Sequence, residues 1–346
     1  MKSDSAILTI AIPTYNRAAK LQAQLERLMP QLTPEVRLCV YDNASPDHTR
    51  EVVAQFPGVA YFRAATNCGA SRNFFCCFEG CATEWLWLLG DDDLVTPTVV
   101  PDLLAVLRHE TADFVHMNFC EQPYARDEVV TDLPALFQHS NFSALLWNTS
   151  GMYRIRSFRP LFRLYNESMS TWAAHMVMVL GLLESQKGKV HLSPLKLTVP
   201  APTRIHWSTV EGLLRFSRVP DCLQRPASQR LVAASIYPGL FNKLMLWGLR
   251  ETSTADQIRR WQRMGSQARF HLQAHRASGV VSHVFRNWHR AGQRRATWQL
   301  AQQAIQIRLL SWCPVALFHV LARCLPLEKS VRENHYNQRK QYATYG

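Results

Sequence analysis

Three consecutive aspartates, Asp91, Asp92 and Asp93, follow an apolar run in the sequence EWLWLLGDDDLVTP. Neighbouring carboxylates repel one another and lose hydration when buried, so such a cluster calls for a positive partner. Mg²⁺ and Mn²⁺ prefer oxygen ligands, and proteins often hold them with one or two carboxylates plus substrate phosphates. One aspartate here would be an ordinary turn or helix N-cap residue. Three together predict binding of a metal ion and a diphosphate.

Polar residues after two other apolar runs complete a nucleotide site. Asp42 can accept a hydrogen bond from a base N–H group or a ribose hydroxyl. Asn67 and Gly69 precede a predicted helix whose N-terminal N–H groups would bind an anion, and Gly69 would allow close approach of the backbone. Arg72 adds a cation. Each is an ordinary turn or surface residue when taken alone, but together they predict a nucleotide diphosphate site.

The first 120 residues alternate between β-branched runs and segments with helical spacing, as strands and helices of an α/β fold do. We predict strands at 6–12, 36–42, 59–64, 84–89 and 112–119, and helices at 18–32, 46–56, 69–82 and 97–109. The first strand should stop at Pro13, and Ser45 should cap the second helix. The alternation predicts βαβ crossovers and a mainly parallel sheet.

The polar segments all lie at the carboxyl ends of predicted strands. Residues 13–17 follow the first strand, 42–45 the second, 66–73 the third and 90–93 the fourth. Ligands of open α/β sheets bind at this edge. We therefore expect four strand ends to converge on one site.

The alternation weakens after about residue 120. Residues 171–184 predict an apolar helix, and residues 190–206 predict an extended, proline-rich segment. We divide the chain into a catalytic domain at 1–210, whose halves 1–120 and 121–210 bind the nucleotide and the acceptor, and a helical basic region at 211–346.

The formal net charge of +13 is concentrated in the second part of the chain. Residues 1–120 carry 9 Lys and Arg against 14 Asp and Glu, whereas residues 121–346 carry 30 against 12. Such a basic region attracts phosphates, anionic membranes or nucleic acids. Its most apolar stretch, 309–326, is interrupted by a proline, a histidine and an arginine. This stretch predicts either a helix in the membrane interface or one packed on the protein's own core.

Nucleic-acid binding is the alternative from another functional class. Trp261, Trp288 and Trp298 lie among arginines in the basic region, as in some nucleic-acid-binding surfaces. The region lacks a recognisable nucleic-acid motif, and a basic helix with tryptophans is equally a solvated face with core anchors. We keep this alternative but expect no nucleic-acid partner.

The nine cysteines do not form a disulfide framework, because their number is odd and most lie in apolar segments. The N-terminus also lacks the apolar run of a signal peptide, so we expect a reducing, cytoplasmic location. Cys76, Cys77 and Cys81 lack the paired spacing of a zinc site. We interpret them as buried helix cysteines.

Four motifs in this order resemble inverting glycosyltransferase family 2, which has the GT-A fold: LTIAIPTYNR, VYDNASPDHT, TNCGASRNF and WLLGDDDLVTP. The resemblance covers about residues 7–120. Within the family it is greatest to bacterial enzymes that add sugars to O-antigen or capsule precursors, such as abequosyltransferase-like proteins. It implies a Rossmann-like nucleotide-diphospho-sugar transferase fold with a helical basic region added at the C-terminus.

The resemblance also implies roles for single residues. It places Pro13, Thr14, Tyr15 and Arg17 beside the nucleotide, Asp42 on its base or ribose, and Arg72 near the base or the diphosphate. It places Asp91 at the ribose and diphosphate and makes Asp92 the main metal ligand, assisted by Asp91 or Asp93. Many members have an aspartate where this chain has Gly90.

Inverting transfer needs a base that removes the proton of the acceptor hydroxyl. Many family members carry Glu-Asp on a downstream helix, where this chain reads Ala174-His175. A histidine with an ordinary pKa near 6.5 can accept this proton, although His175 in an apolar helix is also typical of a buried core residue. Glu167 is the second candidate, with a solvated surface residue as its alternative reading, and other residues stay open.

We therefore expect an inverting, metal-dependent glycosyltransferase that uses a nucleoside-diphosphate sugar. The expected acceptor is a polyprenyl-diphosphate-linked saccharide of O-antigen or capsule synthesis, at the inner face of the cytoplasmic membrane. A nucleotidyltransferase acting on sugar phosphates is the nearer alternative, but the N-terminus has no glycine-rich nucleotidyl loop with a lysine. Donor sugar, linkage and oligomeric state have no code in the sequence.

Overall fold

The structure is a computed structural model, and it describes residues 6–118, 124–140, 142–197, 212 and 215–247. The chain divides into two compact units, residues 1–204 with 221–228 and residues 205–220 with 229–346. Most of the basic region lies outside the described residues, including Trp261, Trp288 and Trp298. The predictions made for that region, and the domain boundary at residue 210, therefore stay predictions.

Four parallel strands form the first half of an eight-stranded sheet. They are β1 (Leu8–Thr14), β2 (Val36–Asp42), β3 (Ala60–Arg63) and β4 (Trp85–Leu88), in the spatial order β3-β2-β1-β4. Their bounds agree with the predicted strands to within two residues. All four carboxyl ends consequently lie at one edge of the sheet, as predicted.

The second half of the sheet is mixed. It adds β7 (Gly151–Arg154), β5 (Phe114–Asn118), β8 (Val190–Lys196) and β6 (Glu128–Val130), in that spatial order. β7 runs antiparallel to both β4 and β5, and β6 runs antiparallel to β8, whereas β5 and β8 are parallel. The prediction of a mainly parallel sheet is therefore correct for the first half only.

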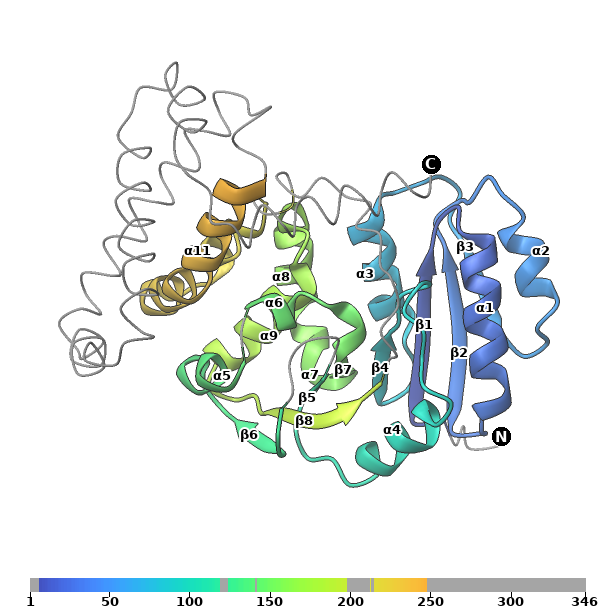
Figure 1. Cartoon of the computed structure of the whole chain (residues 1–346), viewed down its shortest axis with the longest axis horizontal. Coiled ribbons are helices and arrows are strands. Elements are labelled where there is room, and N and C mark those ends of the chain that lie inside the picture. The colour runs from blue at the N-terminus through green and yellow to red at the C-terminus, as the bar shows by residue number, and fades with distance from the viewer. Residues whose placement is uncertain (1–5, 119–123, 141, 198–211, 213–214, 248–346) are drawn as a thin grey trace, which may run out of the picture. The chain divides into compact units, whose positions relative to one another are not determined.

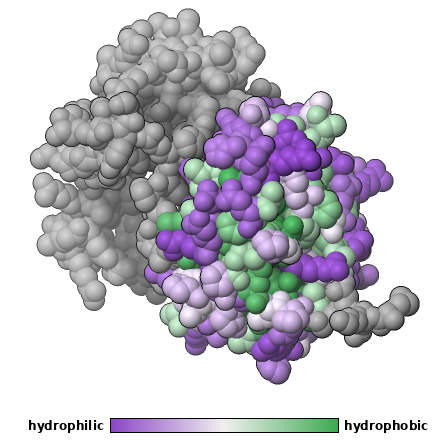
Figure 2. All heavy atoms as spheres, turned by 90° about the vertical axis from the view of Figure 1, so that its right-hand side faces the viewer, coloured by the Kyte–Doolittle hydropathy of each residue, from purple (hydrophilic) through white to green (hydrophobic). Residues whose placement is uncertain are grey.

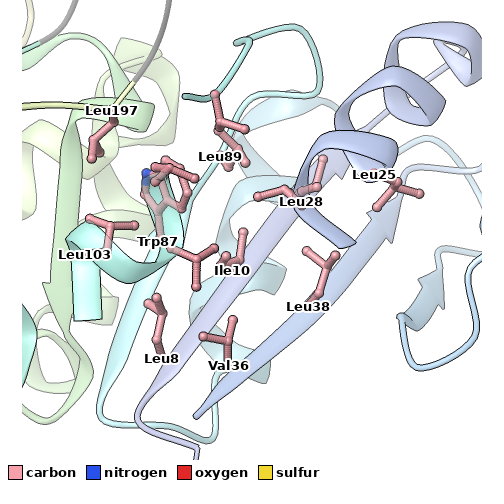
Figure 3. Close-up of a cluster of buried hydrophobic side chains, with 14 of the residues drawn as sticks. Leu8, Ile10, Leu25, Leu28, Val36, Leu38, Trp87, Leu89, Leu103 and Leu197 are labelled. Atoms are coloured by element: carbon pink, nitrogen blue, oxygen red, sulfur yellow. The ribbon is translucent and has the colours of Figure 1, made fainter. Parts of the chain in front are cut away.

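Helices cover both faces of the parallel strands (Figure 1). The helices between the first strands are α1 (Ala18–Leu28), α2 (Thr49–Ala54), α3 (Ala70–Gly80) and α4 (Val99–Leu107). Even-numbered strand residues such as Leu8, Ile10 and Val36 pack against Leu25 and Leu28 of α1 in one core (Figure 3). Because strand side chains alternate between faces, the odd-numbered residues of β1 and β2 face the α3 side. In β4 the odd-numbered residues Trp85 and Trp87 belong to the α1 core instead.

The outer face of the α1 and α2 layer is solvated. Figure 2 views the molecule from this side, and the described surface is largely hydrophilic with small hydrophobic areas between. This face has the charged exterior of an amphipathic helix layer. The candidate ligand site is thus at the strand ends, where the polar segments lie.

Two predicted boundaries are wrong for local reasons. β1 continues through Pro13 to Thr14, whose carbonyl accepts a hydrogen bond on the β2 side. The backbone nitrogen of Pro13 points to the other side, toward β4, and lies beyond the last β1–β4 pair at Ala11–Leu88. The missing N–H group of Pro13 therefore leaves no ladder bond unmade. Ser45 does not cap α2, which begins at Thr49; its hydroxyl accepts the backbone N–H of Asn16 instead.

The segment after β5 adds short helices, one buried helix and the longer helix α11. The helices are α5 (Leu133–His139), α6 (Phe142–Leu145), α7 (Ile155–Phe158), α8 (Phe162–Ser168), α9 (Ala174–Glu184) and α11 (Pro226–Trp247). All eleven residues of α9 are buried, so it is a core helix that is apolar on all sides. It starts three residues later than predicted, because Trp172 adopts a left-handed conformation with φ 59°.

No helix among the residues that the structure describes is both long and apolar enough to cross a membrane. Cys77 is a buried helix cysteine, as predicted, and burial raises its pKa well above its ordinary value. The prediction is wrong in part for the other two, because Cys76 is only partly buried and the buried Cys81 follows the end of α3. A thiol with a raised pKa stays protonated, which is unlike a metal ligand.

Candidate functional site

Asp91 joins the ends of β1 and β4. Its Oδ2 accepts the Thr14 hydroxyl at 2.7 Å, and its Oδ1 accepts a guanidinium N–H of Arg17 at 2.8 Å. The side chain is 5% exposed. Burial raises the pKa of Asp91, while Arg17 and Thr14 act to lower it. The two carboxylate oxygens are consequently fixed by the last residue of β1 and by Arg17 shortly after it.

Asp92 is the more accessible carboxylate. Its side chain is 23% exposed, and its Oδ2 lies 3.2 Å from Arg17 and 2.9 Å from the Lys20 ammonium. Its Oδ1 makes no hydrogen bond or ion pair with any residue that the structure describes. Asp92 therefore offers an oxygen to a ligand, but two cations of the chain compete for its charge.

Asp93 turns away from this pair. Its Oδ2 accepts the Thr149 hydroxyl, and the same hydroxyl accepts the backbone N–H of Gly90. A Cβ at Gly90 would lie 2.4 Å from Asp93 Oδ2, so the carboxylate folds over the glycine. Burial raises the pKa of Asp93 to about 6. This contact explains physically why a side chain does not fit at position 90.

Gln24 holds the aspartate loop from the helix side, a role that sequence reasoning missed. It is fully buried in α1, and its side-chain amide donates to the backbone carbonyls of Asp93 at 2.7 Å and Gly90 at 3.3 Å. Thr149, in the turn Asn148–Ser150, was also missed. The only sequence signal for Gln24 is a polar residue next to the buried row of Leu21, Leu25 and Leu28.

Asp42 is fully buried at the end of β2. Its Oδ1 accepts the backbone N–H of Ser45 at 2.8 Å, and its Oδ2 accepts the Tyr61 hydroxyl at 2.5 Å and the Arg63 guanidinium. Although burial acts to raise it, these hydrogen bonds hold the pKa of Asp42 below its ordinary value. The carboxylate predicted to contact the nucleotide is therefore buried and bonded to three protein donors.

The loop before α3 is closed by side-chain amides. Asn43 donates to Asn67 at 2.8 Å and accepts the Cys68 N–H at 2.9 Å, and Asn67 accepts the Gly69 N–H at 2.9 Å. Gly69 has φ 82° and ψ 158°, a conformation that is open essentially to glycine alone. No atom lies within 4 Å of the position of its Cβ, so backbone conformation rather than crowding explains the glycine.

Arg72 and Tyr15 are exposed to a similar extent, but Arg72 already has partners. Arg72 lies 3.1 Å from Glu79 along α3 and over the ring of Phe75, so its guanidinium has partners on the helix itself. Tyr15, directly after β1, is 42% exposed. The nucleotide contacts predicted for Pro13, Tyr15 and Arg72 stay predictions.

Backbone contacts join the two groups of strand-end residues. The Asn43 N–H donates to the Thr14 carbonyl at 3.0 Å, and the Asn16 N–H donates to Ser45 Oγ at 2.9 Å. Asp47 accepts the N–H of Ala18 at the start of α1 at 2.9 Å. The ends of β1 and β2 thus form one hydrogen-bonded unit, with the aspartates on the β4 side and Asp42 on the β3 side.

The two candidate bases lie in different environments. His175 is 4% exposed in the first turn of α9, and burial lowers its pKa to about 4, although the carbonyls of Leu145 and Leu146 act to raise it. Its Nε2 has no hydrogen-bond partner among the described residues. Glu167 is exposed on α8 and pairs with Arg163 at 2.8 Å. Glu167 thus matches its alternative reading as a solvated residue.

A metal ion fits this site best when it is shared with a substrate. The described residues contain no group of three His, Cys, Asp or Glu side chains arranged to hold one. Asp91 has both oxygens engaged, Asp93 is turned to Thr149, and Asp92 retains one oxygen. One carboxylate plus phosphate oxygens is an ordinary environment for Mg²⁺. The residues present therefore fit a metal–diphosphate complex with Asp92 as the protein ligand.

Comparison with known proteins identifies a family for the part of the chain that holds these residues. Residues 9–168 match the family model of Glycosyl transferase family 2, and they include every strand-end residue described above. These residues form a family 2 glycosyltransferase domain. The family 2 domain is similar to abequosyltransferase RfbV of Salmonella typhimurium, with 31% identity over 124 residues. It is also similar to an uncharacterized glycosyltransferase of Haemophilus influenzae, with 32% identity over 129 residues.

These curated similarities cover part of each protein. They span 34% and 36% of this chain, and 36% and 41% of the two relatives. The fold similarity is wider: the S. aureus TarS 1-349 structure matches 75% of this chain and 79% of its own with a TM-score of 0.56 and 14% identity. Its complex with UDP-GlcNAc matches with a TM-score of 0.57. The predicted GT-A fold is thus confirmed.

Proposed function

We propose that the protein is an inverting glycosyltransferase that transfers a sugar from a nucleoside-diphosphate sugar to a saccharide. The observation that carries the proposal is the Asp91–Asp92 pair, held by Thr14 and Arg17 at adjoining strand ends inside the family 2 domain. The similar TarS structure in complex with UDP-GlcNAc supports a nucleotide sugar as the donor.

A divalent ion, Mg²⁺ or Mn²⁺, is the proposed cofactor, and Asp92 would hold it together with the donor diphosphate. Such an ion would stabilise the negative charge that develops on the leaving diphosphate. Arg17 and Lys20 already lie at Asp92, so both cations are placed to contact phosphate oxygens. The buried Asp91 fixes Arg17 and faces the ribose and diphosphate in this proposal.

His175 is the proposed base. Its low pKa keeps the imidazole neutral at working pH, and Nε2 is the buried nitrogen without a partner among the described residues. A neutral imidazole nitrogen can accept the proton of the acceptor hydroxyl. The same burial lowers the basicity of the imidazole. Because Nε2 is buried, the role also requires the acceptor hydroxyl to reach the first turn of α9. His175→Gln would test this: full transfer activity excludes the role.

The proposed acceptor is a polyprenyl-diphosphate-linked saccharide of bacterial surface polysaccharide synthesis. The similarity to abequosyltransferase RfbV supports this class, and the basic C-terminal region would favour an anionic membrane surface. Fractionation at low salt would test peripheral attachment at the inner face of the cytoplasmic membrane. Recovery of all protein in the soluble fraction contradicts it.

A panel of nucleotide sugars tests the central proposal. Binding and hydrolysis are measured with Mg²⁺ or Mn²⁺ for the wild type, for Asp92→Asn and for Asp102→Asn, a matched carboxylate change on α4. We expect metal-dependent binding of at least one donor, lost in Asp92→Asn and retained in Asp102→Asn. Unchanged metal-dependent binding in Asp92→Asn would exclude the metal assignment, and no binding of any donor would exclude the transferase.

A further inference from the structure

The burial of Asp42 changes which residue can contact a nucleobase. The carboxylate has no exposed side-chain surface, and three donors occupy its oxygens: the Ser45 N–H, the Tyr61 hydroxyl and the Arg63 guanidinium. Because the side chain has no exposed surface, a base N–H group could reach Asp42 only after one of these groups moves aside. Such a movement would leave the displaced donor to find another partner.

Arg63 is the accessible member of this group. It is the last residue of β3, directly opposite Asp42 in the parallel register, and its side chain is 38% exposed. One guanidinium nitrogen donates to Asp42 and another donates to the Ser45 carbonyl at 2.9 Å. A guanidinium carries five N–H groups, so these two bonds orient it and leave further donors for a ligand.

The same hydrogen-bonded unit includes an exposed aromatic ring. Ser45, whose carbonyl accepts from Arg63, also accepts the Asn16 N–H through its hydroxyl. Asn16 follows Tyr15, which is 42% exposed. An aromatic face and a fixed set of N–H donors are the two features that bind a base, one through stacking and the other through its polar edge.

The distance to the aspartates suits a nucleoside diphosphate. β3 and β4 are separated by β2 and β1, which makes three interstrand steps of about 4.8 Å, or roughly 14 Å. This separation is comparable with the length of an extended nucleoside diphosphate. With the diphosphate at Asp92, the base therefore falls near the ends of β2 and β3.

We infer that Arg63, fixed by Asp42 and Ser45, is the residue that contacts the nucleobase of the donor, through an acceptor atom of the base such as a carbonyl oxygen. Asp42 then positions Arg63 through their ion pair. This inference rests on the proposed function. Arg63 lies in the sequence between the polar segments 42–45 and 66–73 and belongs to neither.

Binding measurements with and without a base test the assignment. Affinities for UDP, GDP, CDP, dTDP and ADP, and for inorganic diphosphate, are measured with Mg²⁺ by calorimetry. The variants are Arg63→Met, the double variant Asp42→Asn/Arg63→Met, and Arg27→Met, an exposed arginine in the last turn of α1. The double variant avoids an unpaired buried carboxylate if Arg63→Met folds poorly, and thermal unfolding checks each protein.

We expect Arg63→Met and the double variant to weaken binding of the preferred nucleoside diphosphate about tenfold or more, as for a lost hydrogen bond to a charged group. Inorganic diphosphate should bind within about twofold of wild type, because Arg63 contacts the base. Arg27→Met should change neither affinity. If the Arg63 variants bind nucleoside diphosphate as the wild type does, or lose equal affinity for inorganic diphosphate, the inference is overturned while the proposed function stands. A wild-type protein that binds no nucleoside diphosphate overturns the proposed function.

Discussion

The hydroxyl of Thr14 lies 2.7 Å from Oδ2 of Asp91 and joins the end of β1 to the loop after β4. The two residues are 77 positions apart, and the parallel pairing of Leu8–Ala11 with Trp85–Leu88 brings them together. Arg17 occupies the other oxygen, so Asp91 has one orientation. A buried carboxylate with fixed partners is rigid, which is what a site that positions a diphosphate requires.

Replacement of Thr14 by valine should weaken donor binding. Valine keeps the β-branched shape but removes the hydroxyl, which leaves one oxygen of Asp91 buried without its donor. Such a group costs about 1–3 kcal/mol, so we expect lower thermal stability and about tenfold weaker nucleoside diphosphate binding by calorimetry. Thr14→Ser retains the hydroxyl and serves as the control. If valine and serine variants bind equally well, the hydrogen bond does not orient the site.

Removal of Lys20 should strengthen metal binding. Its ammonium lies 2.9 Å from Asp92 Oδ2, where it competes with a divalent ion for the carboxylate. The pair is partly exposed, and such pairs contribute about 0.2–1 kcal/mol. We therefore expect Lys20→Met to raise the affinity for Mn²⁺ alone by up to about fivefold, measured by titration calorimetry. Lys20→Arg keeps the competing charge and should match the wild type. A weaker or unchanged Mn²⁺ affinity in Lys20→Met counts against competition.

A methyl group at position 90 should disrupt the aspartate loop. The Cβ of Gly90→Ala would lie 2.4 Å from Asp93 Oδ2, so the carboxylate must leave Thr149. We expect a destabilisation of about 1–3 kcal/mol, which is typical of overpacking, measured by urea unfolding. Adding Asp93→Ala to Gly90→Ala removes the clash. The double variant should therefore lose less free energy of unfolding than the sum of the losses of the two single variants. If the losses are additive, the contact between position 90 and Asp93 is unimportant.

The first four strands were predictable because each carries a short apolar run that ends in polar residues. β2 matches its predicted bounds, and Asp91, Thr14 and Arg17 meet as the parallel arrangement requires. β7 was not predictable, since its four residues, Gly151 to Arg154, have no pattern of their own. Its place between β4 and β5 depends on tertiary pairing with strands distant in the sequence.

The residues that sequence reasoning missed share one property: they act through partners far along the chain. Gln24 supports a loop 66 to 69 positions away, and Thr149 reaches back 56 positions to Asp93. The sequence identified Asp42 but not Arg63, which covers its carboxylate from 21 positions away. Residue type indicates that a carboxylate is present, whereas its partners depend on the packing of the strand ends.

A histidine between two carboxylates makes stability depend on pH. His191 of β8 lies 2.5 Å from Glu110 through Nδ1 and 2.8 Å from Asp127 through Nε2. The hydrogen bond that His191 donates to Glu110 is the main cause that raises the pKa of His191. Burial acts to raise the pKa of Glu110. The hydrogen bonds that its carboxylate accepts from His191 and from backbone N–H groups lower it. The imidazolium and the carboxylate therefore stabilise each other while both are charged.

The sign of the effect follows from these two directions. The contribution of His191 is complete below the ordinary histidine pKa of about 6.5 and is lost as the pH rises through its raised value. That of Glu110 is complete above its ordinary value and is lost on acidification. We expect His191→Gln to lower the free energy of unfolding by about 1 kcal/mol at pH 5.5, the upper range for a partly exposed pair, and by less at pH 8.5. Urea unfolding at both values checks this, with exposed His139→Gln as control, and a difference independent of pH would contradict the ion pair.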